Sequence, residues 1–365
     1  MKFPYEGKTY SIIRYPETSN RSLRAWSAAD ELMVNYIAEE KLTPTSPVTF
    51  NDRFGFLGSL LEKFQPVSVI NYCSQQKAIQ QNFTANKVSV TGKSFANPLE
   101  KLPSTDLGLI NVPKSMDLFR LFLYQLSQSL TGNGTVLCGF MTRHFTPQML
   151  KIAEAYFEEV GQSRAVKKAR LLILRKPKNF EENNILNEVR LDEHTVLKQY
   201  FGVFSANNID YATQFFIEHL EVKESDQKIL DLASGNGVLA LAARRQQPAS
   251  EIHLMDDSWL AVESSKLNLP EENTYFHFNN SMDELEKGSY DLVISNPPFH
   301  FEHENNIEVS LTLFEEVAQR LKKGGRFELV ANRHLNYKVH LEKLFGRVET
   351  VAENEKFVIY RCTKI

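Results

Sequence analysis

Four consecutive residues, Asn296-Pro297-Pro298-Phe299, have side chains and a backbone suited to hold a planar amine. An exocyclic amine of a nucleobase is conjugated with its ring, so it is a poor nucleophile until acceptors hold its N–H groups and draw its lone pair out of the ring plane. The Asn296 side-chain oxygen and the Pro297 carbonyl are two such acceptors, and the diproline fixes them because proline locks φ. Phe299 can stack on the base. The motif predicts methylation of such an amine, with these four residues as the catalytic set.

A structural interpretation treats the two prolines only as a stiff end of a strand. That interpretation explains neither the Asn nor the Phe. If the motif is catalytic, no general base with a shifted pKa is required, because the product loses its proton readily after the transfer. Catalysis then depends on placing the nitrogen in line with a sulfonium methyl group.

A glycine turn that could hold the methyl donor occupies residues 231–237, DLASGNG. Glycines permit positive φ and let a ligand lie against the backbone. The turn follows a predicted strand and opens a predicted helix, which is the context that a nucleotide-binding turn requires. An ordinary turn is the alternative. The turn predicts S-adenosylmethionine as the cofactor, with contacts from Asp231, Ala233, Gly235, Asn236 and Gly237.

The ribose of such a cofactor needs a carboxylate partner at the end of the next strand, about twenty residues later. Asp256 lies 21 residues beyond Gly235, at the end of the apolar run EIHLMD. Asp257 is the alternative. A glycine turn followed by a strand-end acid at this spacing is a more specific signal than the turn alone.

Two further segments are weaker candidates for cofactor contacts. Phe204 and Ser205, followed by Asp210, could fold over the methionine end of the cofactor, although a helix cap explains them equally well. Asn279 and Asn280 end a predicted strand, where a polar side chain could contact the adenine. Turn residues of this type are also common at such places.

The second half of the chain alternates short apolar runs with helical patterns, which is typical of a parallel sheet covered by helices. Strands are predicted at KILDL, EIHLMD, YDLVIS and RFELVAN, and the helix LTLFEEVAQRL ends close to two glycines. The ligand site of such a sheet lies at the carboxyl ends of its strands. The predicted fold class is α/β, with a doubly wound, mostly parallel sheet.

The first half repeats this plan. TDLGLINVPK parallels YDLVISNPPF, which aligns Asn111 with Asn296, and LTGNGTVLCGFMTRH parallels LKKGGRFELVANRH, which aligns Arg143 with Arg333. Upstream, SVINYCSQQKAIQQN can be laid on EIHLMDDSWLAVESS. Three matches in the same order indicate a duplication, with chance similarity as the alternative. The sequence therefore predicts two tandem Rossmann-like methyltransferase domains.

The two copies differ where chemistry is expected. In place of the two close glycines the first copy has NDRFGFLG, in which Phe54 and its bulky neighbours would obstruct a cofactor. The position of Asp256 falls near Cys73 in the first copy, and NPPF has become NVPK. The amino-terminal domain is therefore predicted to be degenerate, keeping the scaffold without the chemistry.

The halves also differ in charge. Residues 1–190 carry 24 Lys and Arg against 17 Asp and Glu, a balance of +7, and the remainder carries 18 against 28, a balance of −10. Such asymmetry suggests that the first half handles a polyanion. Within it, the candidate contacts to an RNA backbone are Arg164, Lys167, Lys168 and Arg170, with a solvated face as the alternative. The expected boundaries are a degenerate RNA-binding or structural domain at 1–180, a linker at 181–195 and a catalytic domain at 196–365.

Taken together, the motifs resemble the bacterial ribosomal RNA guanine-N2 methyltransferases, which have tandem methyltransferase-like domains. The resemblance covers nearly the whole chain and includes RYPETSNRSLRAWSAADELM, GVFS, DLASGNG, NPPFH and ANRHLNY. It is stronger to the enzymes that act on 23S ribosomal RNA than to their small-subunit relatives. It implies N2 methylation of a guanine in 23S ribosomal RNA, with the degenerate domain helping to hold the RNA and the second domain binding S-adenosylmethionine.

One residue departs from the family pattern: Ala233 occupies a position that is usually glycine. Its methyl group is expected to tighten the loop and weaken cofactor affinity without abolishing activity. The motifs alone leave other planar amines open, on another RNA, on a DNA base or on a protein amide. A non-enzymatic RNA-binding assembly factor is a further alternative, although it would have no physical need for Asn296 or Asp256. The charge split favours protein-free RNA as the partner.

The composition agrees with two domains in the cytoplasm. A chain of 365 residues with 42% hydrophobic content can bury two cores. No apolar run reaches the roughly 18 residues of a membrane span, and the first residues lack the apolar run of a signal peptide. The cysteines show no CxxC spacing, and His300 and His303 lack a third ligand, so neither disulfides nor a metal site is expected.

Overall fold

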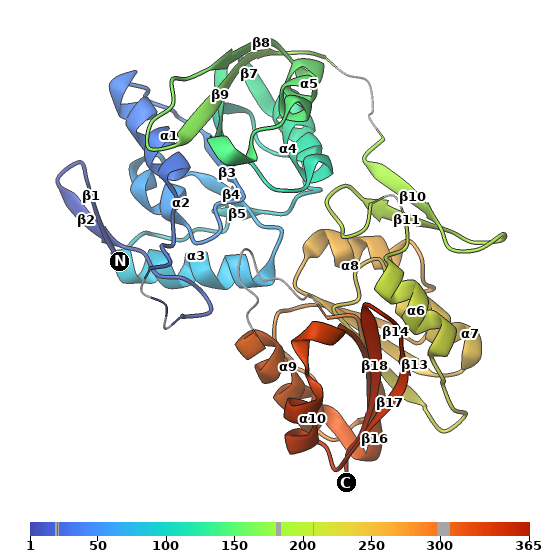
Figure 1. Cartoon of the computed structure of the whole chain (residues 1–365). Coiled ribbons are helices and arrows are strands. Elements are labelled where there is room, and N and C mark those ends of the chain that lie inside the picture. The colour runs from blue at the N-terminus through green and yellow to red at the C-terminus, as the bar shows by residue number, and fades with distance from the viewer. Residues whose placement is uncertain (19, 21, 180–183, 207, 298–306) are drawn as a thin grey trace. The chain divides into compact units, whose positions relative to one another are not determined.

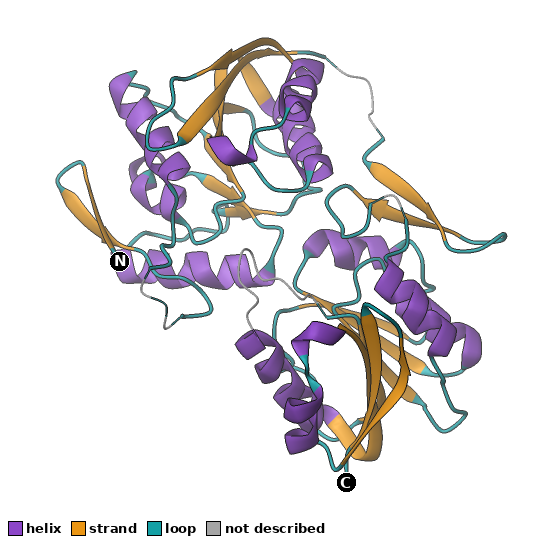
Figure 2. Ribbon diagram, in the orientation of Figure 1, coloured by secondary structure: helices purple, strands orange, loops and turns teal. Residues whose placement is uncertain are grey.

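The computed structural model of the chain describes all residues except 19, 21, 180–183, 207 and 298–306 (Figure 1). The chain forms two compact units, Met1–Ile185 and Leu186–Ile365. Each unit combines helices with a central sheet (Figure 2). In the described part of the chain, no helix is long and apolar enough to cross a membrane.

The second unit is built on a seven-stranded sheet with the order β14-β13-β12-β15-β16-β18-β17. Its strands are β12 (Lys228–Leu232), β13 (Glu251–Asp256), β14 (Thr274–Phe278), β15 (Tyr290–Ser295), β16 (Leu321–Asn332), β17 (Arg347–Glu353) and β18 (Phe357–Thr363). The first five of these strands in the order run parallel, and β18 is antiparallel to both of its neighbours. The predicted doubly wound, mostly parallel sheet is confirmed.

Helices cover both faces of this sheet (Figure 2). They are α6 (Tyr211–His219), α7 (Val238–Gln246), α8 (Trp259–Lys266), α9 (Ile307–Arg320) and α10 (Lys338–Leu344). Alternate side chains of one strand enter different cores: Leu230 of β12 packs with Phe314 of α9, whereas Ile229 packs with Phe216 of α6. Because both faces are buried, the strands are continuous apolar runs rather than alternating ones.

The connections place one site at one edge of the sheet. From β12 the chain proceeds outward through β13 and β14, and it then crosses to β15 on the other side of β12. The order of the strands reverses between β12 and β15, and ligands of open α/β sheets bind beyond the carboxyl ends of the strands at this point. The turn 233–237 follows β12 and Asn296 follows β15, so both predicted motifs lie at this edge.

The first unit repeats the topology with the strand order β5-β4-β3-β6-β7-β9-β8. Its strands are β3 (Pro47–Phe50), β4 (Val67–Val69), β5 (Phe95–Ala96), β6 (Thr105–Asn111), β7 (Leu130–Met141), β8 (Phe157–Gln162) and β9 (Ala169–Pro177). Its helices are α1 (Ala28–Glu39), α2 (Phe56–Leu60), α3 (Cys73–Asn86), α4 (Met116–Ser129) and α5 (Pro147–Tyr156), and a hairpin of β1 (Lys2–Tyr5) and β2 (Lys8–Ser11) precedes them. Position by position, this order matches that of the second unit, as the duplication predicted.

One predicted alignment of the copies agrees with their hydrogen bonds. Asp106 accepts hydrogen bonds from the backbone N–H of Thr45 and Ser46, just before β3. Asp291 accepts in the same way from Gln227 and Lys228, at the start of β12. Equivalent carboxylates therefore tie equivalent strands together, and Asn111 stands at the position of Asn296.

Two other predicted alignments are shifted. Leu107 and Leu292 are equivalent residues of the two copies, and they pair with Thr135 and Arg326, so Thr135 corresponds to Arg326. Strands β7 and β16 have equal lengths and align without a gap, so Arg143 corresponds to His334 and not to Arg333. Strand β4 of the first unit corresponds to β13 of the second. Their pairings make Ile70, three residues before Cys73, the equivalent of Asp256. Cys73 instead begins α3, as Trp259 begins α8.

The predicted linker at 181–195 is too long. Strand β10 (Leu186–Arg190) lies inside it and pairs antiparallel with β11 (Val196–Tyr200). Val189 and Leu197 are fully buried and pack in one cluster with Val238 of α7. The polar residues of this segment suggested a linker, but its apolar positions are covered by the second unit. The hairpin therefore belongs to that unit.

Candidate active site

The side chain of Asn296 is oriented by α6. Its Nδ2 donates to Thr213 Oγ1 at 2.8 Å and to Asp210 Oδ2 at 3.2 Å. A carboxylate only accepts hydrogen bonds, so this contact fixes which end of the amide faces α6. The Asn296 Oδ1 atom is buried, and no residue in the described part of the chain donates to it. The amide therefore presents an acceptor whose donor must come from elsewhere.

Asp210 holds this arrangement from the amino end of α6. The same Oδ2 accepts hydrogen bonds from the backbone N–H of Ala212 at 3.1 Å and of Thr213 at 3.3 Å. The helix-cap interpretation of Asp210 is thus present in the structure, and the cap also orients Asn296. Thr213 was missed in the sequence; its place in the first helical turn after Asp210 is the only local signal for it.

The rest of the predicted amine-binding corner is only partly described. Ser295 is fully buried, and its hydroxyl donates to the carbonyl of Leu232 at 2.7 Å, which ties β15 to β12. Pro297 is buried directly after Asn296. Pro298 and Phe299 lie outside the described residues.

The turn after β12 contains three residues with positive φ, Ala233 at +58°, Gly235 at +56° and Gly237 at +81°. A Cβ at Gly237 would lie 2.6 Å from Leu269 Cδ1, so this glycine is needed for packing at the start of α7. A Cβ at Gly235 would meet nothing within 4 Å. Gly235 therefore borders open space, where a ligand can approach the backbone. Ala233 adopts the left-handed conformation despite its methyl group.

Two carboxylates flank this turn. Asp231 is fully buried; its Oδ2 accepts from Ala240 N at 2.9 Å, and its Oδ1 has no partner among the described residues. Asp256 accepts from Gly235 N at 2.9 Å and from Ser258 N at 2.8 Å. Burial raises the pKa of Asp231 to about 7 and that of Asp256 to about 6, and each acid's charge is further disfavoured by a neighbouring aspartate.

Several buried polar atoms at this edge lack partners in the described part of the chain: Asp231 Oδ1, Ser234 Oγ and Asn296 Oδ1. Unpaired buried polar atoms are costly, and native structures keep few of them without a reason. Asn296 Oδ1 is an acceptor only, and burial disfavours the charges of Asp231 and Asp256, a cost that a cationic ligand would offset. The site therefore fits a ligand that is cationic and carries hydrogen-bond donors, as S-adenosylmethionine does.

Gln199 of β11 joins two predicted motifs and was missed in the sequence. Its Oε1 accepts from Asn236 Nδ2 at 2.7 Å, and its Nε2 lies 3.3 to 3.4 Å from the carbonyls of Val203, Phe204 and Ser205. The Asn236 side chain is thus used to anchor the glycine turn. Phe204 is 71% exposed, and Ser205 has positive φ and donates to the Asn208 carbonyl.

The remaining predicted cofactor residues surround the carboxyl ends of β13 and β14. Asn279 N donates to the carbonyl of Asp256 at 3.1 Å, and Asn279 Oδ1 accepts from the backbone of Asn280 and Ser281. Asn279 therefore shapes the turn next to Asp256, which agrees with the turn interpretation. Asn280 and Asp257 are half-buried beside it.

The equivalent edge of the first unit is filled by its own side chains. Phe54 is 5% exposed within the core, and Ile70 replaces the acid. Asn111 Nδ2 donates to Asp30 Oδ1, itself buried, at 2.6 Å. Gly55 keeps the positive φ of Gly237 and is also closely packed, with Ile79 3.2 Å from its Cβ position. By the same strand pairings Arg53 stands at the position of Gly235, and its guanidinium lies over the Tyr72 ring. The scaffold of the turn is retained without the open glycine beside which a cofactor can lie.

The candidate RNA contacts Arg164, Lys167, Lys168 and Arg170 are exposed and lie at the turn between β8 and β9. They are not equivalent. Lys167 forms an ion pair with Glu31 at 2.8 Å, and Arg170 lies 3.5 Å from Gln162 Oε1. The charge of Lys167 is therefore already partly neutralised.

No group of three or more His, Cys, Asp or Glu side chains in the described part of the chain is arranged to hold a metal ion. His300 and His303 lie outside that part. Cys138 and Cys362 are buried and Cys73 is half-buried, and none of these three cysteines is in a disulfide.

Comparisons with known proteins cover both units. The family model described as RLMG N-terminal domain matches residues 1–179, and the one described as methyltransferase small domain matches residues 194–361. A protein of Pseudoalteromonas translucida named ribosomal RNA large subunit methyltransferase G is 32% identical over 98% of this chain and 96% of its own. A protein of the same name from Pectobacterium atrosepticum is 31% identical over 97% and 96%.

A solved structure also matches over the whole chain. It is the T. thermophilus 16S rRNA N2 methyltransferase in complex with AdoMet and guanosine, with a TM-score of 0.77 at 21% identity over 100% of this chain and 98% of that chain. At this identity the likeness shows the fold alone.

Proposed function

The chain belongs to the family of ribosomal RNA large subunit methyltransferase G, and from this premise we propose that its second unit methylates the exocyclic N2 amine of a guanine in 23S ribosomal RNA, with S-adenosylmethionine as donor. The observation that carries the proposal is the orientation of Asn296. Its Nδ2 is held by Asp210 and Thr213, and its buried Oδ1 has no donor among the described residues. An amine N–H supplies that donor.

The turn and the two acids form the proposed cofactor site. S-adenosylmethionine supplies a sulfonium methyl group that a nucleophilic nitrogen can displace. Gly235 leaves space beside the backbone, and Asp256 accepts the ribose hydroxyls as well as the Gly235 N–H. Asp231 places a second carboxylate beneath the turn, which favours a cationic ligand electrostatically.

The amine is activated by position. Asn296 Oδ1 and the Pro297 carbonyl accept its two N–H groups, which turns its lone pair away from the ring and toward the donor methyl. Pro298 stiffens this corner and Phe299 stacks on the base. The nitrogen would take the methyl group as the carbon–sulfur bond breaks, with S-adenosylhomocysteine as the leaving group, and would then give one proton to water. The rate enhancement comes from holding the reacting atoms in line rather than from a strong base.

The RNA is proposed to be protein-free 23S ribosomal RNA, so the activity belongs in the cytoplasm. The basic first unit contributes backbone contacts through Arg164, Lys168 and Arg170, which are exposed. Lys167 contributes less because of its pairing with Glu31. The target guanine must leave its stack to reach the corner, as in other enzymes that act on a base.

The test uses Asn296→Ala in the full chain. We expect methyl transfer to ribosomal RNA from cells lacking this protein to fall by at least a hundredfold, because the amine loses its oriented acceptor. The affinity for S-adenosylhomocysteine, measured by calorimetry, stays within about threefold, a difference of roughly 0.7 kcal/mol. Loss of cofactor affinity in parallel with activity would contradict the proposed role of Asn296.

Two further measurements examine the substrate and the enzyme class. Mass spectrometry of digested RNA after reaction with a labelled methyl donor identifies the nucleoside, and a product other than N2-methylguanosine would overturn the guanine assignment. Failure of the wild-type protein to bind S-adenosylhomocysteine at high micromolar concentration would favour a non-catalytic assembly factor.

A further inference from the structure

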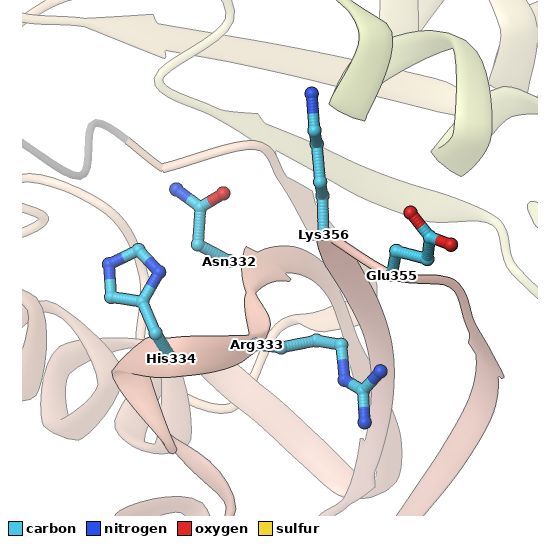
Figure 3. A pocket seen from close by; sticks show the side chains of 5 residues that line it. All are labelled: Asn332, Arg333, His334, Glu355 and Lys356. Carbon is cyan, nitrogen blue, oxygen red and sulfur yellow. The ribbon is translucent and has the colours of Figure 1, made fainter.

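A shallow hollow outside the proposed cofactor site lies at the carboxyl edge of the second sheet. It is lined by Asn332, Arg333, His334, Glu355 and Lys356 (Figure 3). The first three follow the end of β16 and the last two precede β18, and Arg333 N donates to the Lys356 carbonyl at 2.9 Å. The hollow therefore joins two segments of the chain that lie more than twenty residues apart.

The hollow is next to the amine-binding corner. Strands β15 and β16 are neighbours, with Ser295 paired to Leu329. Asn332 lies three residues beyond Leu329, whereas Asn296 lies one residue beyond Ser295. Relative to Asn296, the hollow therefore begins on the neighbouring strand, roughly 4.8 Å away, and two residues farther along the strand direction. A group bound there therefore lies near a base held at Asn296.

The charged groups of the hollow favour an anion on one side. The side chain of Lys356 has no acceptor in the described part of the chain, and those of Arg333, His334 and Lys356 are exposed. Arg333 donates to the Asn354 carbonyl at 3.1 Å and lies 4.0 Å from Glu353, which fixes part of its guanidinium. In Figure 3, Asn332 and His334 project to one side, and Arg333 and Glu355 to the other.

An exposed aromatic side chain begins the helix that orients Asn296. Tyr211, the first residue of α6, is 78% exposed and directly follows Asp210, whose carboxylate orients Asn296. Large aromatic side chains are normally buried, and an exposed ring beside a site for a base is typical of a stacking platform. Phe204, at 71% exposed, belongs to the segment that Gln199 ties to the glycine turn.

The first unit keeps the same basic corner although it has lost the cofactor site. Thr142 N donates to the Lys168 carbonyl at 2.8 Å, as Arg333 N does to Lys356. Arg143 and Lys168 are exposed there, at the positions of His334 and Lys356, and Thr142 stands at the position of Arg333. A feature shared by both copies, only one of which has space for a cofactor, serves another ligand. RNA backbone is the polyanion that both units would meet.

We propose that the substrate strand crosses the carboxyl edge of the second unit. Arg333 on one side of the hollow and His334 with Lys356 on the other bind the phosphates of neighbouring nucleotides, and a base stacks on Tyr211. The proposal rests on the proposed function, because it assumes that the base at Asn296 belongs to RNA. Arg and Lys supply the charge, and the Asn332 amide, which projects to the side of His334, can donate to the phosphate bound there. Glu355 opposes the phosphate electrostatically and limits the affinity.

The first experiment compares two double variants of the full chain. The corner variant combines Arg333→Ala and Lys356→Ala, and the matched control combines Lys287→Ala and Lys323→Ala. Lys287 and Lys323 are exposed at the opposite edge of the same sheet, so the control removes equal charge. Binding of a labelled 23S fragment is followed by anisotropy across salt concentrations. The corner variant should bind at least tenfold more weakly and lose about 1.4 from the logarithmic salt slope, as expected for two phosphate contacts of a single strand.

The second experiment uses changes with opposite expected signs. Glu355→Gln should tighten RNA binding severalfold because it removes a carboxylate beside the phosphate. Tyr211→Ala should raise the KM for RNA severalfold, whereas Tyr211→Phe should keep it within about twofold because the ring is retained. Binding of S-adenosylhomocysteine, which also reports folding, should be unchanged in every variant.

The outcomes separate this inference from the proposed function. If the wild-type protein methylates RNA but the corner variant matches the Lys287/Lys323 control in affinity and salt slope, the phosphate site is wrong. Equal KM values for Tyr211→Ala and the wild type would remove the stacking platform. If the wild-type protein neither binds S-adenosylhomocysteine nor methylates RNA, the proposed function fails first.

Discussion

At the scale of single residues, the site depends on which polar atoms already have hydrogen-bond partners within the protein. Asn296 has one end committed to α6 and the other end unpartnered among the described residues. The carboxylate of Asp210 cannot donate, so the amide cannot turn over without losing a charge-assisted hydrogen bond. The same reasoning separates Gly235, which borders open space, from Gly237, which is packed against Leu269.

Thr213 should act as a positioning residue. Thr213→Val removes the closer of the two acceptors of Asn296 Nδ2 and leaves the volume nearly unchanged. One hydrogen bond of this kind contributes about 1 kcal/mol, so kcat should fall roughly fivefold to tenfold. The KM for S-adenosylmethionine should stay constant, and Thr213→Ser should restore kcat. An equal loss in Thr213→Ser would mean that the methyl packing, and not the hydroxyl, is what matters.

Ala233 should be a strained position. Its φ of +58° is unfavourable for a residue with a Cβ. Ala233→Gly relieves roughly 1 to 2 kcal/mol of strain in the folded state and loses roughly 0.4 to 1 kcal/mol through the more flexible unfolded chain. The free energy of unfolding should therefore rise by about 0.5 to 1 kcal/mol, measured by urea denaturation. A destabilised variant would show that the methyl group makes contacts that offset the strain.

At the scale of elements, β13 and β14 carry a pair of histidines that cannot both be protonated without losing their contact. His253 Nδ1 lies 2.9 Å from His277 Nε2, and the two rings stack with planes 6° apart. Burial lowers the pKa of both, that of His277 to about 4, and the proximity of His253 lowers it further. Only one of the two facing nitrogens can donate, so protonation of both rings would break the contact.

This pair predicts a loss of stability in acid. Between pH 6.5 and about 4 the unfolded chain binds more protons at His277 than the folded chain, so this residue's contribution to stability falls as the pH decreases through that window. Buried Asp231 and Asp256 act in the opposite direction because their pKa values are raised. The test therefore compares the wild type with His277→Gln. The decrease in the urea midpoint of unfolding from pH 7 to pH 5 should be smaller in the variant than in the wild type. An equal difference in both proteins would exclude His277 as a source of the acid sensitivity.

At the scale of the whole molecule, the two units share a topology and differ in what fills the same edge. In the second unit the glycine turn and Asp256 leave space, whereas in the first unit Phe54 and Ile70 fill it. Near that edge, the first unit keeps the exposed basic side chains of Arg143 and Lys168. This division fits one unit for chemistry and another for holding a polyanion.

The basic turn of the first unit gives a prediction with an internal control. Arg164→Ala and Lys168→Ala should each weaken binding of a 23S fragment and lower the logarithmic salt slope by about 0.7 to 0.9, the value for one phosphate contact. Lys167→Ala should change the slope less because its charge is paired with Glu31. Equal effects for the three substitutions would show that the Lys167–Glu31 pair opens on binding RNA. No effect from any of them would make the turn a solvated face.

The sequence by itself determined the fold class, the duplication and the motifs of the candidate site, because each is encoded within a short stretch: alternating strand and helix patterns, a glycine turn, an acid at a fixed spacing. The tertiary structure alone decided what each side chain does. Asp210 and Thr213 reach Asn296 across more than eighty residues, and Arg333 meets Lys356 only because β16 and β18 are neighbours. It also corrected the alignment of Asp256 with Cys73 and shortened the predicted linker, since strand pairing and burial, rather than local composition, fix register and domain limits.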